Sequence, residues 1–226
     1  IDLAPQAVMR TSPTAGAFPH YFTERFFKIF DIVDGEYVQF DETLKLKLDP
    51  MIGVIGTAPA GEGIDTETPY DHGGNMDCTR IGEGAALYLP VNAEGALLAM
   101  GDLHARMGDG EVEVCGVEIA GKVTVKLTVL KNCKLPTPFL VNSELAMAIH
   151  SAETVDEACV GATMAMHGFL TGELGMNEHE AGMLLSVTGN LCICQVVDPE
   201  KTVRMEIPLS VTDKQVKSAF SSATQL

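Results

Sequence analysis

Two short stretches of the sequence concentrate residue types that bind metal ions. They are DHGGNMD at residues 71–77 and GDLHARMGDGEVEV at residues 101–114. Imidazole and carboxylate groups together suit Zn, Mn or Fe better than Ca or Mg. Both stretches carry His and Asp in glycine-rich turns at the ends of expected strands. We therefore interpret them as parts of one divalent-metal site, with zinc as the first choice and Mn or Fe as alternatives.

The spacing within each stretch can bring its polar side chains together. The glycine pair at 73–74 opens backbone conformations that other residues rarely adopt, so His72 and Asp77 can turn toward a common point. Asp102 and His104 are two positions apart and share one face of an extended strand. These four polar residues are the candidate metal ligands.

A Gly-Asp-Gly turn at residues 108–110 follows in the second stretch. It brackets Asp109 and leads to Glu111, so both carboxylates can be aimed toward the same point as the candidate ligands. Asp109 and Glu111 therefore join the candidate site.

Each of these residues also has an ordinary structural interpretation. A single His beside a glycine pair more often hydrogen-bonds within its loop than binds metal, and Asp-Gly is a common turn dipeptide. The agreement between the two stretches favours a site. Elsewhere, Cys192 and Cys194 fall on one side of an apolar strand pattern and are interpreted as small core residues. The sequence contains no GxSxG, HExxH or Walker motif.

The charge balance excludes some classes of partner. The 226 residues include 15 Lys and Arg against 31 Asp and Glu, a net charge of −16 that repels phosphate backbones and anionic lipids. No apolar run approaches the roughly 20 residues that cross a membrane. We therefore expect neither nucleic acid nor a membrane as a partner. Six cysteines without a secreted-domain framework, and no visible signal peptide, predict reduced thiols in a cytoplasmic protein.

The elements that must position these residues are expected to be strands followed by helices. Alternation predicts strands at 37–40, at 44–48, within 85–103 and over 111–130, with 51–74 as a long ordered loop. A period of about 3.6 residues predicts a helix over 154–172, capped by Thr154 or Ser151, and a second from Asn177 to about residue 187. A closing β-hairpin is expected around the DPEK turn.

Together these elements predict an α+β fold, with a β-rich, sandwich-like body and helices segregated toward the C-terminus. We expect a single domain over 1–226, β-rich over 1–140, helical over 150–188 and closed by a hairpin over 190–210.

The sequence resembles the acetamidase/formamidase family in long stretches that occur in the family's order. They are MIGVIGTAPA at 51–60, HGGNMD at 72–77, LYLPV at 87–91, GALLAMGDLHARMGDGEVEVCGVEIAG at 95–121 and GNLCICQVVDPEKTVRMEIP at 189–208. The resemblance implies hydrolysis of a small aliphatic amide such as formamide or acetamide, on a β-sandwich-like body in a homo-oligomer. Family members have a further N-terminal stretch, which this chain is expected to lack.

The implied chemistry suits the candidate residues. Resonance makes an amide a poor electrophile, so its hydrolysis needs an activated water, a stabilised oxyanion and a proton for the departing ammonia. A metal ion can supply the first two. We assign Glu111 as general base and then acid, although Asp109 can exchange this role with it and either can be a ligand. Backbone N–H groups of the loop around Gly73, Gly74 and Asn75 are candidates for holding the oxyanion.

Two other functions fit the same residues. One is a non-catalytic β-sandwich binding module with a metal-stabilised loop, which a closed coordination sphere would favour. The other is a metal-dependent hydrolase of a cyclic amide or ester, which a substrate panel separates from the amidase.

The apolar surface predicts self-association. The VTVKLTV stretch within 111–130 is expected to place one face in the core, and the helical stripe around Met166 adds further apolar surface. Because one chain has limited means of covering both, we expect a homodimer or a higher homo-oligomer.

Overall fold

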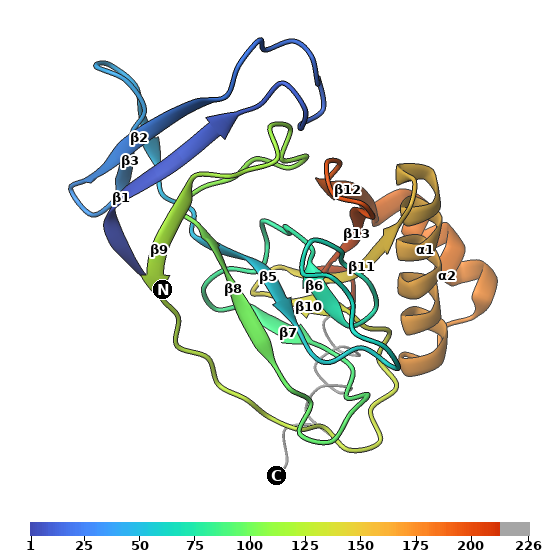
Figure 1. The fold of residues 1–226 in the computed structure, drawn as a ribbon. Coiled ribbons are helices and arrows are strands. Elements are labelled where there is room, and N and C mark those ends of the chain that lie inside the picture. Colours follow the sequence, from blue (N-terminus) through green and yellow to red (C-terminus); the bar gives the residue numbers. More distant parts are fainter. Residues whose placement is uncertain (213–226) are drawn as a thin grey trace.

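The computed structural model describes residues 1–212, which form two antiparallel β-sheets and a layer of helices (Figure 1). The larger sheet has eight strands in the order β4-β3-β2-β1-β9-β8-β5-β6. They are β1 (Asp2–Thr11), β2 (Phe26–Val33), β3 (Tyr37–Gln39), β4 (Lys45–Lys47), β5 (Met51–Gly56), β6 (Gly73–Asn75), β8 (Ala99–His104) and β9 (Glu118–Lys122).

The smaller sheet has five strands in the order β12-β13-β11-β10-β7. They are β7 (Ala86–Tyr88), β10 (Phe139–Val141), β11 (Leu145–Ala152), β12 (Asn190–Gln195) and β13 (Lys201–Pro208). Between β11 and β12 lie α1 (Val155–Gly168), the π-helical turn η1 (Phe169–Glu173) and α2 (Glu178–Thr188). The predicted α+β class with a β-rich body is confirmed.

The smaller sheet is the middle layer of the molecule, and the alternation of β11 explains why. Met147 and Ile149 belong to the core shared with the larger sheet, whereas Ala146 and Ala148 belong to the core beneath the helices. Side chains of a strand point alternately to its two faces, so β11 buries both of them. Figure 1 shows α1 and α2 on the side of this sheet that faces away from β5 and β8.

The predicted helices are confirmed, and their first residues explain where they begin. Thr154 accepts a hydrogen bond from the backbone N–H of Glu157, whose side chain accepts one from the N–H of Thr154, which completes a capping box. Asn177 caps α2 by accepting from the N–H groups of His179 and Glu180. The closing hairpin is also confirmed, because β12 and β13 pair antiparallel around the DPEK turn.

The prediction of a loop over 51–74 is wrong for its first residues. Met51–Gly56 forms β5, which is paired with β8 on one side and with β6 on the other. The glycines that argued against regular structure here permit close approach of neighbouring groups within the sheet. The loop is therefore confined to residues 57–72.

The strongest strand prediction, over 111–130, is also largely wrong. Only Glu118–Lys122 forms a strand, β9. Glu111 and Val114 adopt positive φ angles of 46° and 62°, which break an extended chain. The VTVKLTV stretch has no partner strand within residues 1–212, and Leu127 is 70% exposed, so its expected core face is absent from this part of the chain.

Several strands were not predicted. β1 and β2 pair over six residue positions. β11 (Leu145–Ala152) lies beyond the region expected to be β-rich and runs into the region expected to be helical from 150, and β10 (Phe139–Val141) crosses the expected boundary at 140. The sequence of β11, LAMAIHSA, has weak strand propensity, and pairing with β10 and β13 on its two sides decides its conformation. Among the described helices, none is long and apolar enough to cross a membrane.

Candidate functional site

A cavity of about 400 Å³ opens between the edge of the larger sheet and the β12–β13 turn. Half of its lining residues are acidic, namely Glu67, Asp77, Asp102, Glu111, Glu118 and Asp198, and Arg10 also lines it. Side chains around it form three overlapping groups, each with its ligand atoms within 4.8 Å of one another. They are Asp77, Asp102 and His104; His104, Glu111 and Glu118; and Asp77, Glu111 and Asp198.

His104 lies at the centre of this cluster because it ends β8, where that strand is paired on both sides. It is opposite Met51 of β5 and opposite Glu118 of β9. Its Nε2 is 3.0 Å from Glu118 Oε1 and 3.6 Å from Asp102 Oδ1, and its Nδ1 is 3.9 Å from Asp77 Oδ1. The imidazole is only 1% exposed, yet neither ring nitrogen completes a hydrogen bond within the described residues.

Asp77 and Asp102 meet over the backbone of Gly53. A Cβ atom at position 53 would lie 2.5 Å from Asp77 Oδ1 and 2.5 Å from Asp102 Oδ2, closer than real Cβ contacts come. Only glycine at position 53 therefore leaves room for both carboxylates against the backbone of β5. Asp77 Oδ1 is buried and has no hydrogen-bond partner in residues 1–212.

Three residues of the cluster have unusual backbone geometry. Asp77, Asp102 and Glu111 have φ angles of 43°, 56° and 46°, in the left-handed region that non-glycine residues rarely occupy. Such conformations cost on the order of 1–3 kcal/mol each and concentrate at functional sites. In this protein they direct three carboxylates toward one cavity.

Asp198 closes the cavity from the smaller sheet. It lies in the β12–β13 turn, where its backbone N–H donates to Gln195 Oε1 at 3.1 Å. Asn75 Nδ2 of β6 donates to Asp198 Oδ2 at 3.0 Å, which links the two sheets across the cavity. Asn75 Oδ1 makes no hydrogen bond to any described residue.

The pKa values of the cluster report a crowded, buried set of negative charges. The pKa of Glu111 is raised to about 9, mainly by burial and next by the negative charge of the neighbouring Asp77. Burial and then Asp77 raise the pKa of Asp198 to about 8. Burial lowers the pKa of His104, but Asp102 and Glu118 outweigh it and bring that pKa to about 11. A divalent cation would neutralise these carboxylates and displace the imidazole proton.

The donor set fits a divalent metal ion. The first group offers one imidazole and two carboxylates, which is a common ligand set for zinc and related ions. Asp77 Oδ1 and both nitrogens of His104 are buried and complete no hydrogen bond within the described residues, which is what a missing ligand would leave behind.

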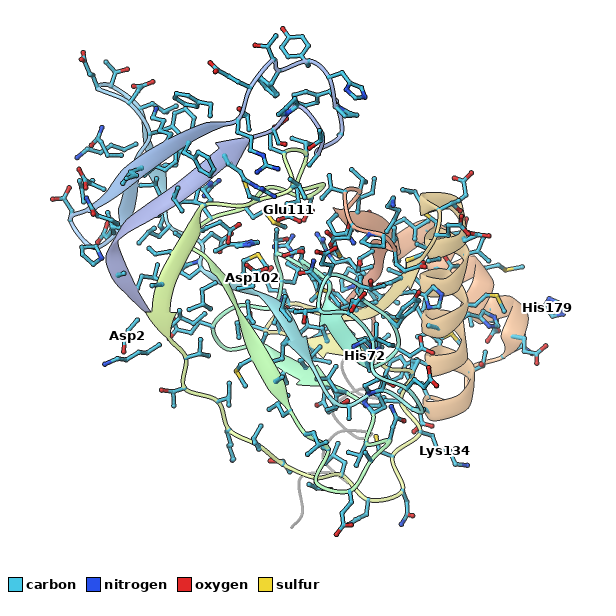
Figure 2. The ribbon with its side chains drawn as sticks, viewed as in Figure 1. Asp2, His72, Asp102, Glu111, Lys134 and His179 are labelled. Carbon is cyan, nitrogen blue, oxygen red and sulfur yellow. The ribbon has the colours of Figure 1, made fainter. Side chains whose placement is uncertain are left out.

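The structure brings most of the predicted site residues together. Asp77, Asp102, His104, Glu111 and Asn75 all belong to the cluster or line its cavity. Figure 2 shows Asp102 and Glu111 near the centre of the molecule.

His72 is placed differently from the prediction, because it is in none of the three groups. Its ring lies near Gly56, and Gly56 is three residues along β5 from Gly53. At roughly 3.3 Å per residue, these two glycine positions lie about 10 Å apart along β5. Figure 2 likewise draws His72 apart from Asp102 and Glu111.

The other predicted residues, Asp109, Gly73 and Gly74, do not line the cavity. Asp109 faces Arg204 of β13, with Nη2 and Oδ2 2.6 Å apart. The N–H of Gly73 donates to the carbonyl of Tyr70 at 2.9 Å, so it is already engaged, and Gly74 is buried in the β5–β6 pairing.

Glu118 and Asp198 were not identified from the sequence. Glu118 looks like one polar position of an alternating strand, and Asp198 like the first residue of a DPEK turn. The sequence signal that could have found Glu118 is its position shortly after the polar segment that contains Asp102 and His104. Asp198 had no local signal, because its role depends on the contact between the two sheets.

The fold and the cluster define an α+β protein with a buried carboxylate–histidine site on its larger sheet. Residues 50–214 match the Acetamidase/Formamidase family, and the chain belongs to this family. It is similar in structure to an acetamidase from Bacillus halodurans, with a TM-score of 0.92 and 47% identity over 95% of this chain and 72% of that one.

Other relatives have related names. A predicted acetamidase/formamidase from Thermoanaerobacter tengcongensis has a TM-score of 0.92 and 44% identity, over 95% of this chain and 71% of that one. A formamidase from Methylophilus methylotrophus is 43% identical over 74 residues, which are 32% of this chain and 18% of that protein. The match to this curated relative thus spans less than a fifth of its length.

Proposed function

We propose that this chain is the catalytic part of an amidase that hydrolyses a small aliphatic amide, of the formamide or acetamide type, to a carboxylate and ammonia. The observation that carries the proposal is the Asp77–Asp102–His104 group beside an acidic cavity, in which Asp77 and His104 are buried with ligand atoms that make no hydrogen bond to the described residues, in a member of the acetamidase/formamidase family. Names of the relatives support the reaction class.

The proposed ligands of the divalent ion, zinc in the first instance, are Asp77, Asp102 and His104. Glu118 lies 3.0 Å from His104 Nε2 and either orients the imidazole or joins the ligands. When bound, the ion supplies an acidified water and a polarised carbonyl. His72 lies outside this ligand set, because its ring is beside Gly56 rather than Gly53.

Glu111 is the proposed proton carrier. Its carboxyl is buried within reach of Asp77, and its pKa of about 9 keeps a proton on it at neutral pH in the ion-free protein. With a divalent ion bound beside it, the pKa of Glu111 would be lower and nearer the range in which a carboxyl both accepts and donates a proton. Departure of ammonia needs such a donor.

The cavity supports a small, neutral substrate. Its volume of about 400 Å³ is at the low end for ligand pockets. The side-chain amide of Asn75 lines it, and its Oδ1 is buried and makes no hydrogen bond to the described residues. The carboxylates that surround the cavity disfavour anionic substrates.

The test is ammonia release from formamide and acetamide by the purified protein, with metal content measured on the same sample. We expect turnover that is lost after chelation and restored by zinc, and at least one ion per chain. Absence of turnover with zinc bound would favour the binding-module alternative. Turnover of a cyclic amide or an ester, but not of formamide or acetamide, would favour the second alternative.

We also propose that the chain assembles as a homodimer or higher homo-oligomer in the cytoplasm. Met166 is fully buried, so the apolar surface that supports assembly is on other residues. Met164 of α1, Met183 and Val187 of α2 and Leu191 of β12 are each at least 49% exposed. Light scattering at micromolar concentration tests this, and a monomer mass contradicts it.

A further inference from the structure

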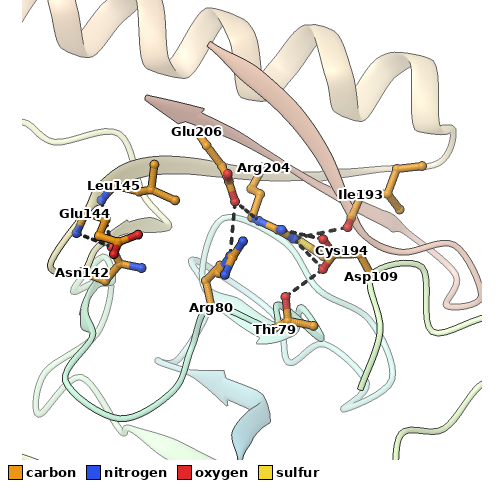
Figure 3. A network of polar contacts seen from close by, with 10 residues as sticks. All are labelled: Thr79, Arg80, Asp109, Asn142, Glu144, Leu145, Ile193, Cys194, Arg204 and Glu206. Carbon is orange, nitrogen blue, oxygen red and sulfur yellow. Dashed lines mark hydrogen bonds and ion pairs between the residues drawn. The ribbon is translucent and has the colours of Figure 1, made fainter. Parts of the chain in front are cut away.

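A buried arginine lies behind the candidate site and contacts the chain segments that carry it. Arg204 of β13 is fully buried, and its Nε donates to Glu206 Oε1 at 2.7 Å. Its Nη1 and Nη2 donate to the two carboxylate oxygens of Asp109, at 2.9 Å and 2.6 Å. Figure 3 shows this two-point contact between the guanidinium and the carboxylate. Because the guanidinium is planar, such a pair fixes orientation as well as distance.

Asp109 also connects Arg204 to the segment that carries Asp77. Thr79 Oγ1 donates to Asp109 Oδ1 at 2.7 Å (Figure 3). Thr79 is two residues after Asp77, and Asp109 is two residues before Glu111. One carboxylate therefore joins the two segments that present the proposed ion ligand and the proposed proton carrier.

The turn that carries Glu111 is also held by backbone hydrogen bonds: the N–H of Glu111 donates to Gly108 O at 3.2 Å, and the N–H of Val114 donates to Glu111 O at 2.8 Å. Its backbone is docked on β12, since Gly110 N–H donates to Cys194 O at 2.9 Å and Val196 N–H donates to Gly110 O at 3.2 Å. Glu111 itself has a φ angle of 46°, which it holds only if its surroundings oppose relaxation. The pair between Asp109 and Arg204 lies immediately before this strained residue.

We propose that Arg204 and Asp109 are positioning residues, and that the ion pair between the buried guanidinium and the partly exposed carboxylate sets the placement of Glu111 relative to Asp77. The inference rests on the proposed function and extends it to residues that line no part of the cavity. Asp109 then acts through Glu111 and does not itself exchange a proton with the substrate. Its carboxylate is saturated by Arg204 and Thr79, and these contacts hold its pKa below its usual range.

The experiment compares Thr79→Val and Asp109→Asn with the wild type, with Asp34→Asn as a matched control. Asp34 forms an exposed ion pair with Lys45 at 3.4 Å, and Asn tolerates its positive φ angle equally. Measurements are kcat and KM for formamide, metal content, melting temperature and the visible spectrum of the cobalt-substituted protein. Each variant is assayed well below its own melting temperature.

We expect both site variants to keep their metal and KM and to lose kcat by about tenfold to a hundredfold, since misplacement by about 1 Å has effects of that size. The double variant should be no slower than Asp109→Asn alone, because Thr79 acts through Asp109. A shifted cobalt spectrum should accompany the loss, and Asp34→Asn should match the wild type.

A kcat of folded Thr79→Val and Asp109→Asn within twofold of the wild type would overturn the inference and leave the proposed function intact. Additive losses in the double variant would also overturn it. A wild-type protein that binds metal but releases no ammonia would instead overturn the proposed function. If Asp109→Asn does not fold, the milder Thr79→Val still decides the outcome.

Discussion

The imidazole of His104 and the carboxylate of Glu118 lie directly opposite each other in the β8–β9 pairing, with Nε2 and Oε1 3.0 Å apart. The two residues are 14 positions apart in the sequence and meet because β8 and β9 pair in the sheet. A buried imidazole with a carboxylate partner has a fixed ring orientation, and such partners strengthen metal binding.

Replacing Glu118 should therefore weaken the proposed ion site without destroying the fold. Glu118→Gln keeps the shape of the side chain and removes its charge, and we expect zinc affinity to fall by about tenfold to a hundredfold. Competition with a chelating dye measures this affinity. Glu36→Gln, at an exposed turn, is the control, and equal affinities in the two variants would remove Glu118 from the site.

Glu111→Gln tests the proton carrier. If Glu111 carries the proton, the variant should fold, retain its metal and lose kcat by about 10² to 10⁴, the usual range for general acid–base assistance. Ammonia release and metal stoichiometry are measured on one preparation. Loss of metal together with activity would identify Glu111 as a ligand instead, and normal turnover would exclude it from the mechanism.

Gly53→Ala should disrupt the ion site by displacing two of its proposed ligands. The added methyl group would collide with the carboxylates of Asp77 and Asp102, whereas a Cβ at Gly101 of the adjacent strand β8 meets no atom within 4 Å. We expect Gly53→Ala to lose most of its bound zinc and its activity, and Gly101→Ala to keep both. Metal analysis of the two folded variants decides, and zinc retained in Gly53→Ala would contradict the proposed arrangement.

The two histidines should respond differently to substitution. His104→Gln removes the imidazole at the centre of the cluster and should abolish stoichiometric zinc binding. His72→Gln should retain the ion, because its ring lies beside Gly56 and Gly74. Zinc lost equally from both variants would restore the sequence-based prediction that they share one ion.

The metal-free protein should become less stable as pH rises. The pKa of Glu111 is about 9 in the folded chain against 4.5 for the free side chain, and that of Asp198 is about 8 against 3.8. Between these values the folded state binds more protons than the unfolded state, so the free energy of unfolding falls with pH. His104, raised from 6.5 to about 11, acts in the same direction.

Melting temperatures with chelator present should therefore fall from pH 5 to pH 9, and the fall should be shallower in Glu111→Gln. Saturating zinc should raise the melting temperature most at the alkaline end, where the carboxylates are ionised. A melting temperature of the chelated protein that rises across this range would contradict the assigned pKa directions.

The sequence by itself determined the elements whose signals are local. The capping box at Thr154, the Asn177 cap and the apolar stripe of α1 depend on residues within a few positions of one another, so α1 and α2 could be predicted nearly to their ends. The closing hairpin was readable for the same reason. Asp102, His104 and Glu111 were found because one polar segment carries all three.

The tertiary structure decided what depends on partners distant in the chain. LAMAIHSA is a strand because β10 and β13 pair with it, and VTVKLTV is not one within the described residues because no strand lies beside it. Alternation can describe a strand, but hydrogen bonds to a neighbour make one.

The membership of the site was decided in the same way. Asp77 and Asp102 can approach each other because the residue of β5 next to both carboxylates is Gly53, which has no side chain. Asp198 joins them because the smaller sheet packs against the larger one. His72 belongs to none of the ligand groups, and its ring lies beside Gly56, three residues along β5 from Gly53. Residue types can be read from the sequence, but the distances that make ligands of them arise from packing.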